Sequence, residues 1–264
     1  MSASTCMSTS TSATLDRKAA RGHWLPFAVW MGGMLLLQVL AEVATLPRWA
    51  APVVYAAKSL LCAALLLRDR PWRLYTGMRI ADWVPAAAAG LVVAAIWIVP
   101  ETPLAGRVFP SFQTFYHRWL ILPPGRLPSY FDPATFPALP FNHPSLAFSP
   151  AEAGWALVGA KLLGSAFVIA VIEEYFFRGF LYRWIRNADF RSITLGRYDA
   201  AAFWLVVLLF GLEHDRWLAG LIAGAVYGAL AVRTGRVAPA VTAHVVTNLV
   251  LGLYVIATGQ YGFW

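Results

Sequence analysis

Two adjacent glutamates, Glu173 and Glu174, lie in the stretch AVIEEYFFRGFLYRW, directly after an apolar run long enough to enter a membrane. A carboxylate at membrane depth is costly and normally faces a protein interior or a wet cavity, where it has a partner. Arg178 follows Glu174 by four residues, the favourable spacing for an ion pair along a helix. Because Glu173 has no such local partner, we predict that Glu173 exchanges protons with a reactant.

Helix geometry separates the two glutamates. Successive residues of a helix point about 100° apart, so we expect the carboxylates of Glu173 and Glu174 not to point at the same spot. The alternative is purely structural: Glu174 and Arg178 form a simple buried pair, and Glu173 extends to the cytoplasmic edge of the membrane.

Two further pairs of residues occur in later apolar runs. Phe210 and His214 are four residues apart, as are His244 and Asn248, so each pair shares one helix face. These are the only two of the five histidines that fall in predicted membrane spans. A lone histidine in such a span is more often a hydrogen-bonded packing residue than a catalyst, but His244 has an amide on its own face.

These side chains are a sufficient set for hydrolysis of a peptide bond. Glu173 can take a proton from water and return it to the leaving amine. One imidazole can orient the water, while an asparagine amide and the second imidazole can donate hydrogen bonds to the developing oxyanion.

In this order, the three motifs resemble those of a known family. Residues 173–178 match E-E-x-x-x-R, residues 210–214 match F-x-x-x-H and residues 244–248 match H-x-x-x-N. They are similar to the motifs of the CPBP family (CAAX protease and bacteriocin-processing, or Abi) of intramembrane proteases, which includes the type II CAAX prenyl endopeptidases. The resemblance covers residues 153–258, about 40% of the chain. Within the family, the chain is most similar to the CAAX-protease-related proteins found with exosortase sorting systems.

The resemblance implies an endopeptidase that cuts a membrane-anchored peptide or protein, without implying that this substrate is prenylated. It implies three roles: activation of water by Glu173 with His214, stabilisation of the oxyanion by His244 and Asn248, and support of the site by Glu174 and Arg178. The family is often described as metalloproteases, and two histidines with one glutamate could bind zinc in an open site. Because the chain has no H-E-x-x-H, we prefer a mechanism without a metal and expect no cofactor.

The composition is that of a helical membrane protein. Of the 264 residues, 59% are apolar and 13% charged, and the mean hydropathy is +0.60. We therefore predict an all-α polytopic protein with about seven transmembrane helices, within a range of six to eight. The candidate spans, of which the fifth and sixth are short, are 24–41, 51–67, 83–99, 153–177, 200–214, 217–232 and 238–258.

The basic residues carry topological information. The net charge of +8 could suit a nucleic-acid binder, but the positive residues form short clusters between apolar runs. Fourteen of the 21 fall on the side of the N-terminus and five on the other, with Lys58 and Lys161 inside spans. This distribution predicts a cytoplasmic N-terminus, with the lipid bilayer and a membrane-anchored substrate as partners and no nucleic acid. It fits a bacterial inner membrane, which we favour, or an endoplasmic reticulum.

Four segments follow from these patterns: a disordered cytoplasmic tail (1–22), three transmembrane helices (23–100), an external loop rich in proline and aromatic residues (101–151), and a catalytic helical core (152–264). Eleven of the 17 prolines fall between residues 100 and 150, so we expect an irregular loop that lies against the membrane interface. In the core, Gly220, Gly224 and Gly228 recur every four residues and predict a smooth face for close helix packing.

The charge-based topology would separate Glu173 from His214 unless the fourth helix continues past Glu174, as far as Trp184, or the fifth is short or tilted. We expect a hydrated pocket where the two meet. Two other functions stay open. One is a proton-coupled transporter, which the absence of matching broken helices in the two halves disfavours. The other is a non-catalytic scaffold or immunity protein on the same fold.

Overall fold

The computed structural model describes residues 4–122, 124–125, 127–128, 131 and 143–264. Arg126 and Tyr130 of the predicted external loop lie outside the described residues. Within the described ranges the chain forms helices and no strand, which confirms the all-α prediction.

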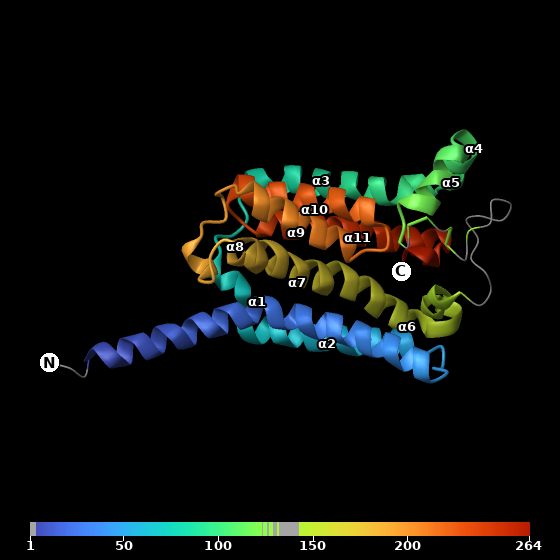
Figure 1. The fold of residues 1–264 in the computed structure, drawn as a ribbon. Helices are drawn as coiled ribbons and strands as arrows, with labels where there is room; N and C mark the ends of the chain where they lie inside the picture. The colour runs from blue at the N-terminus through green and yellow to red at the C-terminus, as the bar shows by residue number, and fades with distance from the viewer. Residues whose placement is uncertain (1–3, 123, 126, 129–130, 132–142) are drawn as a thin grey trace.

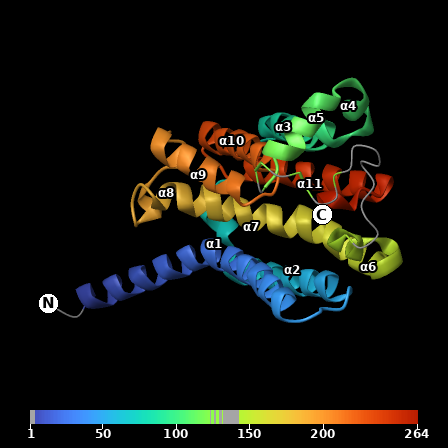
Figure 2. The same ribbon diagram turned by 45° about the vertical axis from the view of Figure 1, so that its right-hand side comes forward.

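Six helical spans are long and apolar enough to cross a membrane, and a seventh apolar helix is shorter. They are built from α1 (Ser4–Val43), α2 (Ala50–Asp69), α3 (Ile80–Ile98), a continuous span of α6 (Pro150–Leu163), α7 (Ala170–Glu174) and α8 (Tyr182–Trp184), the short α9 (Ala200–Leu212), α10 (Trp217–Thr234) and α11 (Ala238–Thr258). The helices lie side by side, with α1 and α2 on one side of the span of α6, α7 and α8, and with α3, α9, α10 and α11 on the other (Figures 1 and 2). This layout places the motif-bearing helices α7, α9 and α11 next to one another.

Helix α1 begins well before the predicted membrane span. It starts at Ser4, whereas the sequence predicted a disordered tail through residue 22. A helix that has already formed extends at little cost, and contacts with other segments hold it near residues 21–23. Arg21 forms an ion pair with Asp69 of α2 at 3.0 Å, and the buried His23 lies 2.7 Å from the hydroxyl of Tyr75.

The predicted irregular loop contains short helices, so that prediction is wrong for much of its described part. Helix α4 covers Pro103–Val108 and α5 covers Pro110–Trp119, and a 3-10 turn covers Pro144–Phe148. Each begins at a proline, which is well accepted at the first helical position because the backbone N–H there has no helical partner. The clustered prolines therefore start helices in this segment.

Residues 101–122 contact the turn between α9 and α10 and fix its position. The guanidinium of Arg216 pairs with both carboxylate oxygens of Glu101, at 2.9 Å for the Nη2–Oε2 contact. The indole N–H of Trp217 donates to the carbonyl of Trp119 at 3.0 Å. Because His214 lies in this turn, residues 101–122 help to fix its position.

Close approach of helices brings the motifs together. A Cβ on Gly220 of α10 would lie only 3.0 Å from the Cα of Gly211 on α9, which confirms the predicted smooth glycine face. On the other side of the core, a Cβ on Gly90 of α3 would lie 2.8 Å from the Cβ of Val246 on α11 and would also meet the carbonyl oxygen of Ala243. Only glycine therefore fits where α3 meets α11.

Replacing Gly90 with alanine should separate α3 from α11 and lower the free energy of unfolding by about 2 kcal/mol, because overpacking forces backbone shifts. Unfolding in mixed micelles, followed by circular dichroism, measures this change. Gly159→Ala on α6 is the matched control, since a Cβ there meets nothing within 4 Å, and it should leave stability equal or slightly higher. Equal unfolding of the two variants would contradict the assigned close contact.

Candidate active site

The two glutamates lie in an unusual stretch of helix. Helix α7 is bounded by two π-helical segments, Gly164–Ile169 before it and Tyr175–Leu181 after it. Such wider turns are frequent at functional sites, since they shift the direction of the side chains. The helical span continues to Trp184, and α9 ends at Leu212 after 13 residues. A fourth helix that continues past Glu174 and a short fifth helix are the two features that we expected would let Glu173 and His214 meet.

Glu174 and Arg178 form the predicted ion pair. The Nη1 of Arg178 lies 2.9 Å from the Oε1 of Glu174, and both side chains are buried. The Nη2 of Arg178 donates to the carbonyl of Gly224 at 2.9 Å, and the guanidinium lies 4.4 Å from the ring centroid of Phe210. Arg178 therefore joins its own helix to α9 and α10.

His244 lies between the two glutamates. Its Nδ1 is 3.0 Å from the Oε1 of Glu174, and its Nε2 is 3.8 Å from the Oε2 of Glu173. Tyr227 stacks on the imidazole with the ring centroids 4.8 Å apart, which fixes the plane of the ring. The two carboxylates thus point to different places, as expected, but they approach opposite nitrogens of one imidazole.

Glu173 has a buried carboxylate oxygen without a hydrogen bond. Its Oε2 is buried and has no hydrogen-bond partner among the described residues. Buried polar atoms are nearly always hydrogen-bonded, so an exception calls for an explanation such as a catalytic role or a water molecule. The position of this oxygen suits the transfer of a proton to or from a reactant.

His214 is held in one tautomer. Its Nδ1 lies 2.7 Å from the carbonyl oxygen of Phe210. Because a carbonyl oxygen only accepts, Nδ1 must carry the hydrogen, which leaves Nε2 of the neutral ring as an acceptor. Trp97 contacts the ring edge-on at 5.3 Å between centroids. The fixed ring presents an acceptor nitrogen beside the cavity.

Asn248 connects α11 to the first π-helical segment. Its Nδ2 donates to the carbonyl of Ser165 at 2.9 Å, an oxygen that also accepts from the backbone N–H of Ala170. An amide nitrogen carries two hydrogens, so one remains for another acceptor.

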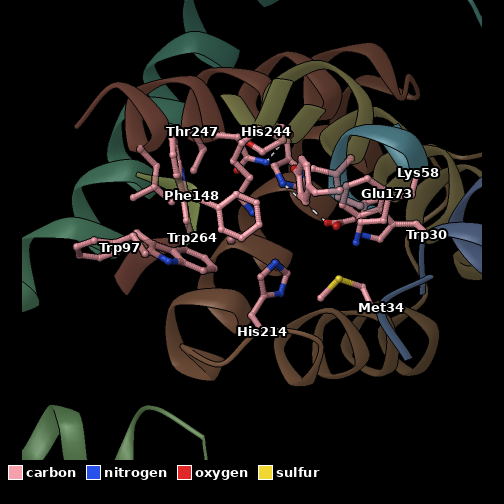
Figure 3. A pocket seen from close by; sticks show the side chains of 18 of the residues that line it. Trp30, Met34, Lys58, Trp97, Phe148, Glu173, His214, His244, Thr247 and Trp264 are labelled. Atoms are coloured by element: carbon pink, nitrogen blue, oxygen red, sulfur yellow. Dashed lines mark hydrogen bonds and ion pairs between the residues drawn. The ribbon is translucent and has the colours of Figure 1, made fainter. Parts of the chain in front are cut away.

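The four predicted reactive side chains line one cavity of about 350 Å³: Glu173, His214, His244 and Asn248. Figure 3 shows the side chains around this space, with Glu173 and Lys58 on one side, Trp97 and Trp264 on the opposite side, and the two histidines facing each other across it. A second cavity of about 660 Å³ also includes Glu173 and His214 in its lining. The two reactive groups therefore lie where the cavities meet.

The donor set does not fit a zinc site. Among the described residues, no three His, Cys, Asp or Glu side chains lie close enough together to hold one metal ion.

The motifs did not identify two other charged groups at the site. Glu213 lines the second cavity, and its Oε2 is buried with no hydrogen-bond partner in the described part of the chain. Its position next to His214 at the end of an apolar run was the available signal. Lys58 comes from α2 and lines the first cavity, and its location inside a predicted span was the corresponding signal.

Comparison with known proteins bears on the region that holds these motifs. Residues 155–250 match the family model described as type II CAAX prenyl endopeptidase Rce1-like. No curated protein and no solved structure matches the chain. The matched residues include all three motifs, so the C-terminal region of this protein resembles the Rce1-like family, which is consistent with a CPBP-type intramembrane protease.

Proposed function

We propose that this protein is an intramembrane endopeptidase in which Glu173 activates the water that hydrolyses a peptide bond of a membrane-associated protein or peptide. The family match supports a CAAX-type intramembrane protease in general terms. The observation that carries the finer proposal is the buried Glu173 Oε2, which has no hydrogen-bond partner among the described residues and faces a cavity shared with His214.

The first step is the attack of water on the substrate carbonyl. Glu173 accepts one proton of the water as general base. The Nε2 of His214 accepts a hydrogen bond from the other hydrogen, since its Nδ1 is already bonded to Phe210. The resulting hydroxide adds to the carbonyl carbon, and the carbonyl oxygen becomes an oxyanion.

The second step requires donors for that oxyanion. Asn248 can supply its second Nδ2 hydrogen. His244 donates Nδ1–H to Glu174, so its Nε2 can donate as well only when the ring is an imidazolium. Glu173 then gives its proton to the peptide nitrogen, the C–N bond breaks, and a carboxylic acid and an amine leave.

The protein is an integral membrane protein, and we propose that its arginine-rich end faces the cytoplasm. Arg183 and Arg186 lie at the end of α8, while Arg233 and Arg236 flank the junction of α10 with α11. The C-terminus of α2 lies at the same end of the bundle (Figure 1). An inner bacterial membrane has this arrangement of positive charge.

A cysteine introduced at the exposed Ser192, in a background without other cysteines, should test this orientation. A membrane-impermeant maleimide should label it only after the membrane has been opened. A cysteine at the exposed Leu104 of α4, at the other end of the bundle, is the matched control and should be labelled in intact cells. The reverse pattern would contradict the proposed orientation.

Glu173→Gln should abolish proteolysis, with a fall of at least about a thousandfold, because an amide cannot act as the base. Quantitative proteomics of membranes would compare intact and cleaved forms of each membrane protein in cells with the native chain or the variant. Glu42→Gln, at an exposed position of α1, is the matched control and should cleave normally. Cleavage that survives in folded Glu173→Gln protein would overturn the mechanism, and pH-driven uptake into vesicles without cleavage would indicate a transporter.

Arg178→Met should lower the free energy of unfolding by about 3 kcal/mol, since it leaves the buried carboxylate of Glu174 without its cation. The double variant Glu174→Gln, Arg178→Met should recover part of this loss without recovering proteolysis, because Nδ1 of His244 then faces an amide instead of a carboxylate. Unfolding in mixed micelles measures both. Arg68→Met removes an exposed arginine from Asp69, which keeps Arg21, and should leave stability nearly unchanged, because water screens an exposed pair. Equal losses for Arg178→Met and Arg68→Met would contradict the structural role given to Arg178.

A further inference from the structure

Both cavities at Glu173 lie in one half of the helix bundle. Helix α10 runs toward the arginine-rich end, and the last of its residues to line either cavity is Tyr227, seven residues before the helix ends at Thr234. Helix α11 runs back from that end, and the first of its lining residues is His244, six residues after Ala238. Given the helical rise, about 10 Å of each helix separates the cavities from the arginine-rich end.

The other helices show the same asymmetry. Helix α2 and the continuous span of α6, α7 and α8 also end at the arginine-rich end (Figure 1). In α2 the lining of the cavities stops at Lys58, eleven residues before the helix ends at Asp69. In the longer span it stops at Glu173, eleven residues before Trp184. Glu173 therefore lies at the floor of the cavities, on the side of the arginine-rich end.

A layer of buried side chains closes this floor. The rings of Phe27 on α1 and Phe176 stack with their centroids 4.0 Å apart, and Phe177 contacts Phe210 of α9 edge-on at 5.3 Å. The guanidinium of Arg178 is buried and lies 4.4 Å from the Phe210 centroid. These residues join α1, the helix that carries Glu173, and α9 between the cavities and the arginine-rich end.

Beyond this layer the described residues pack closely. A void of about 10 Å³ adjoins Arg178 on that side, with Tyr182 and Gly228 in its lining. A space of this size holds at most about one water molecule. The two cavities at Glu173, of about 350 and 660 Å³, have instead the size of ligand sites. A peptide that came from the arginine-rich end would have to break the buried ion pair of Glu174 with Arg178 to reach Glu173.

At the opposite end the second cavity reaches the surface. Its lining includes the exposed Gln38 of α1 and the exposed Asp215 of the turn after α9. This turn and the C-terminus lie at the end of the bundle that carries α4 and α5 (Figure 1). Because the same cavity contains Glu173 and His214, the reactive groups are accessible from the end that carries α4 and α5.

We propose that the site takes its substrate only from the end that carries α4 and α5, which the proposed orientation places outside the cytoplasm. This inference rests on the proposed function. Glu173 lies about 16 Å from the end of its span, near the middle of a hydrocarbon core of about 30 Å. The substrate is then a membrane protein that has already been translocated, cut in the outer half of its span or in the adjoining outer segment. A chain end anchored in the cytoplasmic leaflet is excluded.

Thiol accessibility in sealed membranes tests this direction without requiring cleavage. Leu251 and Val241 are half-buried residues of α11, but Leu251 lines the first cavity and Val241 lines neither. Each is replaced by cysteine in a full chain that lacks Cys6 and Cys62. The probe is sulfonatoethyl methanethiosulfonate, which does not cross membranes, and protection from a fluorescent maleimide reports its reaction. Leu251→Cys should react about tenfold faster in sealed spheroplasts than in inverted vesicles, since the thiol must be accessible to react. Val241→Cys should react slowly in both.

Two reference variants locate the opening relative to the bundle. Leu104→Cys marks the end that carries α4 and α5, and Ser192→Cys marks the arginine-rich end. Leu251→Cys should react from the same side as Leu104→Cys. Reaction from the side of Ser192→Cys, from both sides equally or from neither would overturn the inference. Val54→Cys, which lines the first cavity from α2, provides the same readout should Leu251→Cys not fold.

The positions of the cuts separate this inference from the proposed function. New chain ends that disappear with Glu173→Gln should map to the outer half of membrane spans or to the segments that adjoin them outside. Cuts on the cytoplasmic side would overturn the direction of entry and leave the protease standing. Access to Leu251→Cys from outside, together with no cleavage that depends on Glu173, would refute the proposed function and leave the direction of opening standing.

Discussion

The buried contact of Glu174 with Arg178 and His244 is the constraint on which the site depends. Breaking a buried charge pair is strongly destabilising because the remaining charge is left without compensation. Here the pair is shared, since Arg178 also donates to Gly224 of α10 and Glu174 also accepts from His244 of α11. Three helices therefore keep their relative positions through one carboxylate. Glu173 is left as a second carboxylate outside this pair, with its Oε2 3.8 Å from the Nε2 of His244, where it can gain and lose a proton.

Helices outside the motif-bearing region complete the cavity. Trp30 and Met34 of α1 line both cavities, and Tyr55 of α2 lines the first. These residues carry no catalytic motif, but they exclude lipid from the site. A low local dielectric constant strengthens the interaction of Glu173 with its surroundings. The N-terminal helices thus set the environment in which the proposed chemistry of the C-terminal region would operate.

The sequence was informative where residue types are unusual for their surroundings. Burying glutamate, histidine or asparagine in an apolar run costs free energy. The expectation that Glu173, His214 and His244 meet could therefore be stated from the sequence, and the structure places them around one cavity. The π-helical segments beside α7 could not be foreseen, because they require no particular residue type. The bridging position of His244 depends on how α11 packs against α7, which no local pattern contains. The clustered prolines led to a wrong prediction of irregular structure for residues 103–119, where proline begins helices instead of ending them.

The brevity of α9 affects how the protein fits a bilayer. Thirteen residues of helix are about 20 Å long, whereas the hydrocarbon core is about 30 Å thick. This is a hydrophobic mismatch, and lipid alone would have to thin around the helix. Polar protein fills the missing length instead: the backbone N–H of Leu122 donates to the carbonyl of Asp215, and Glu101 neutralises Arg216. The polar residues at this end of α9 also line the second cavity, so the shortness of the helix lets a polar cavity reach His214.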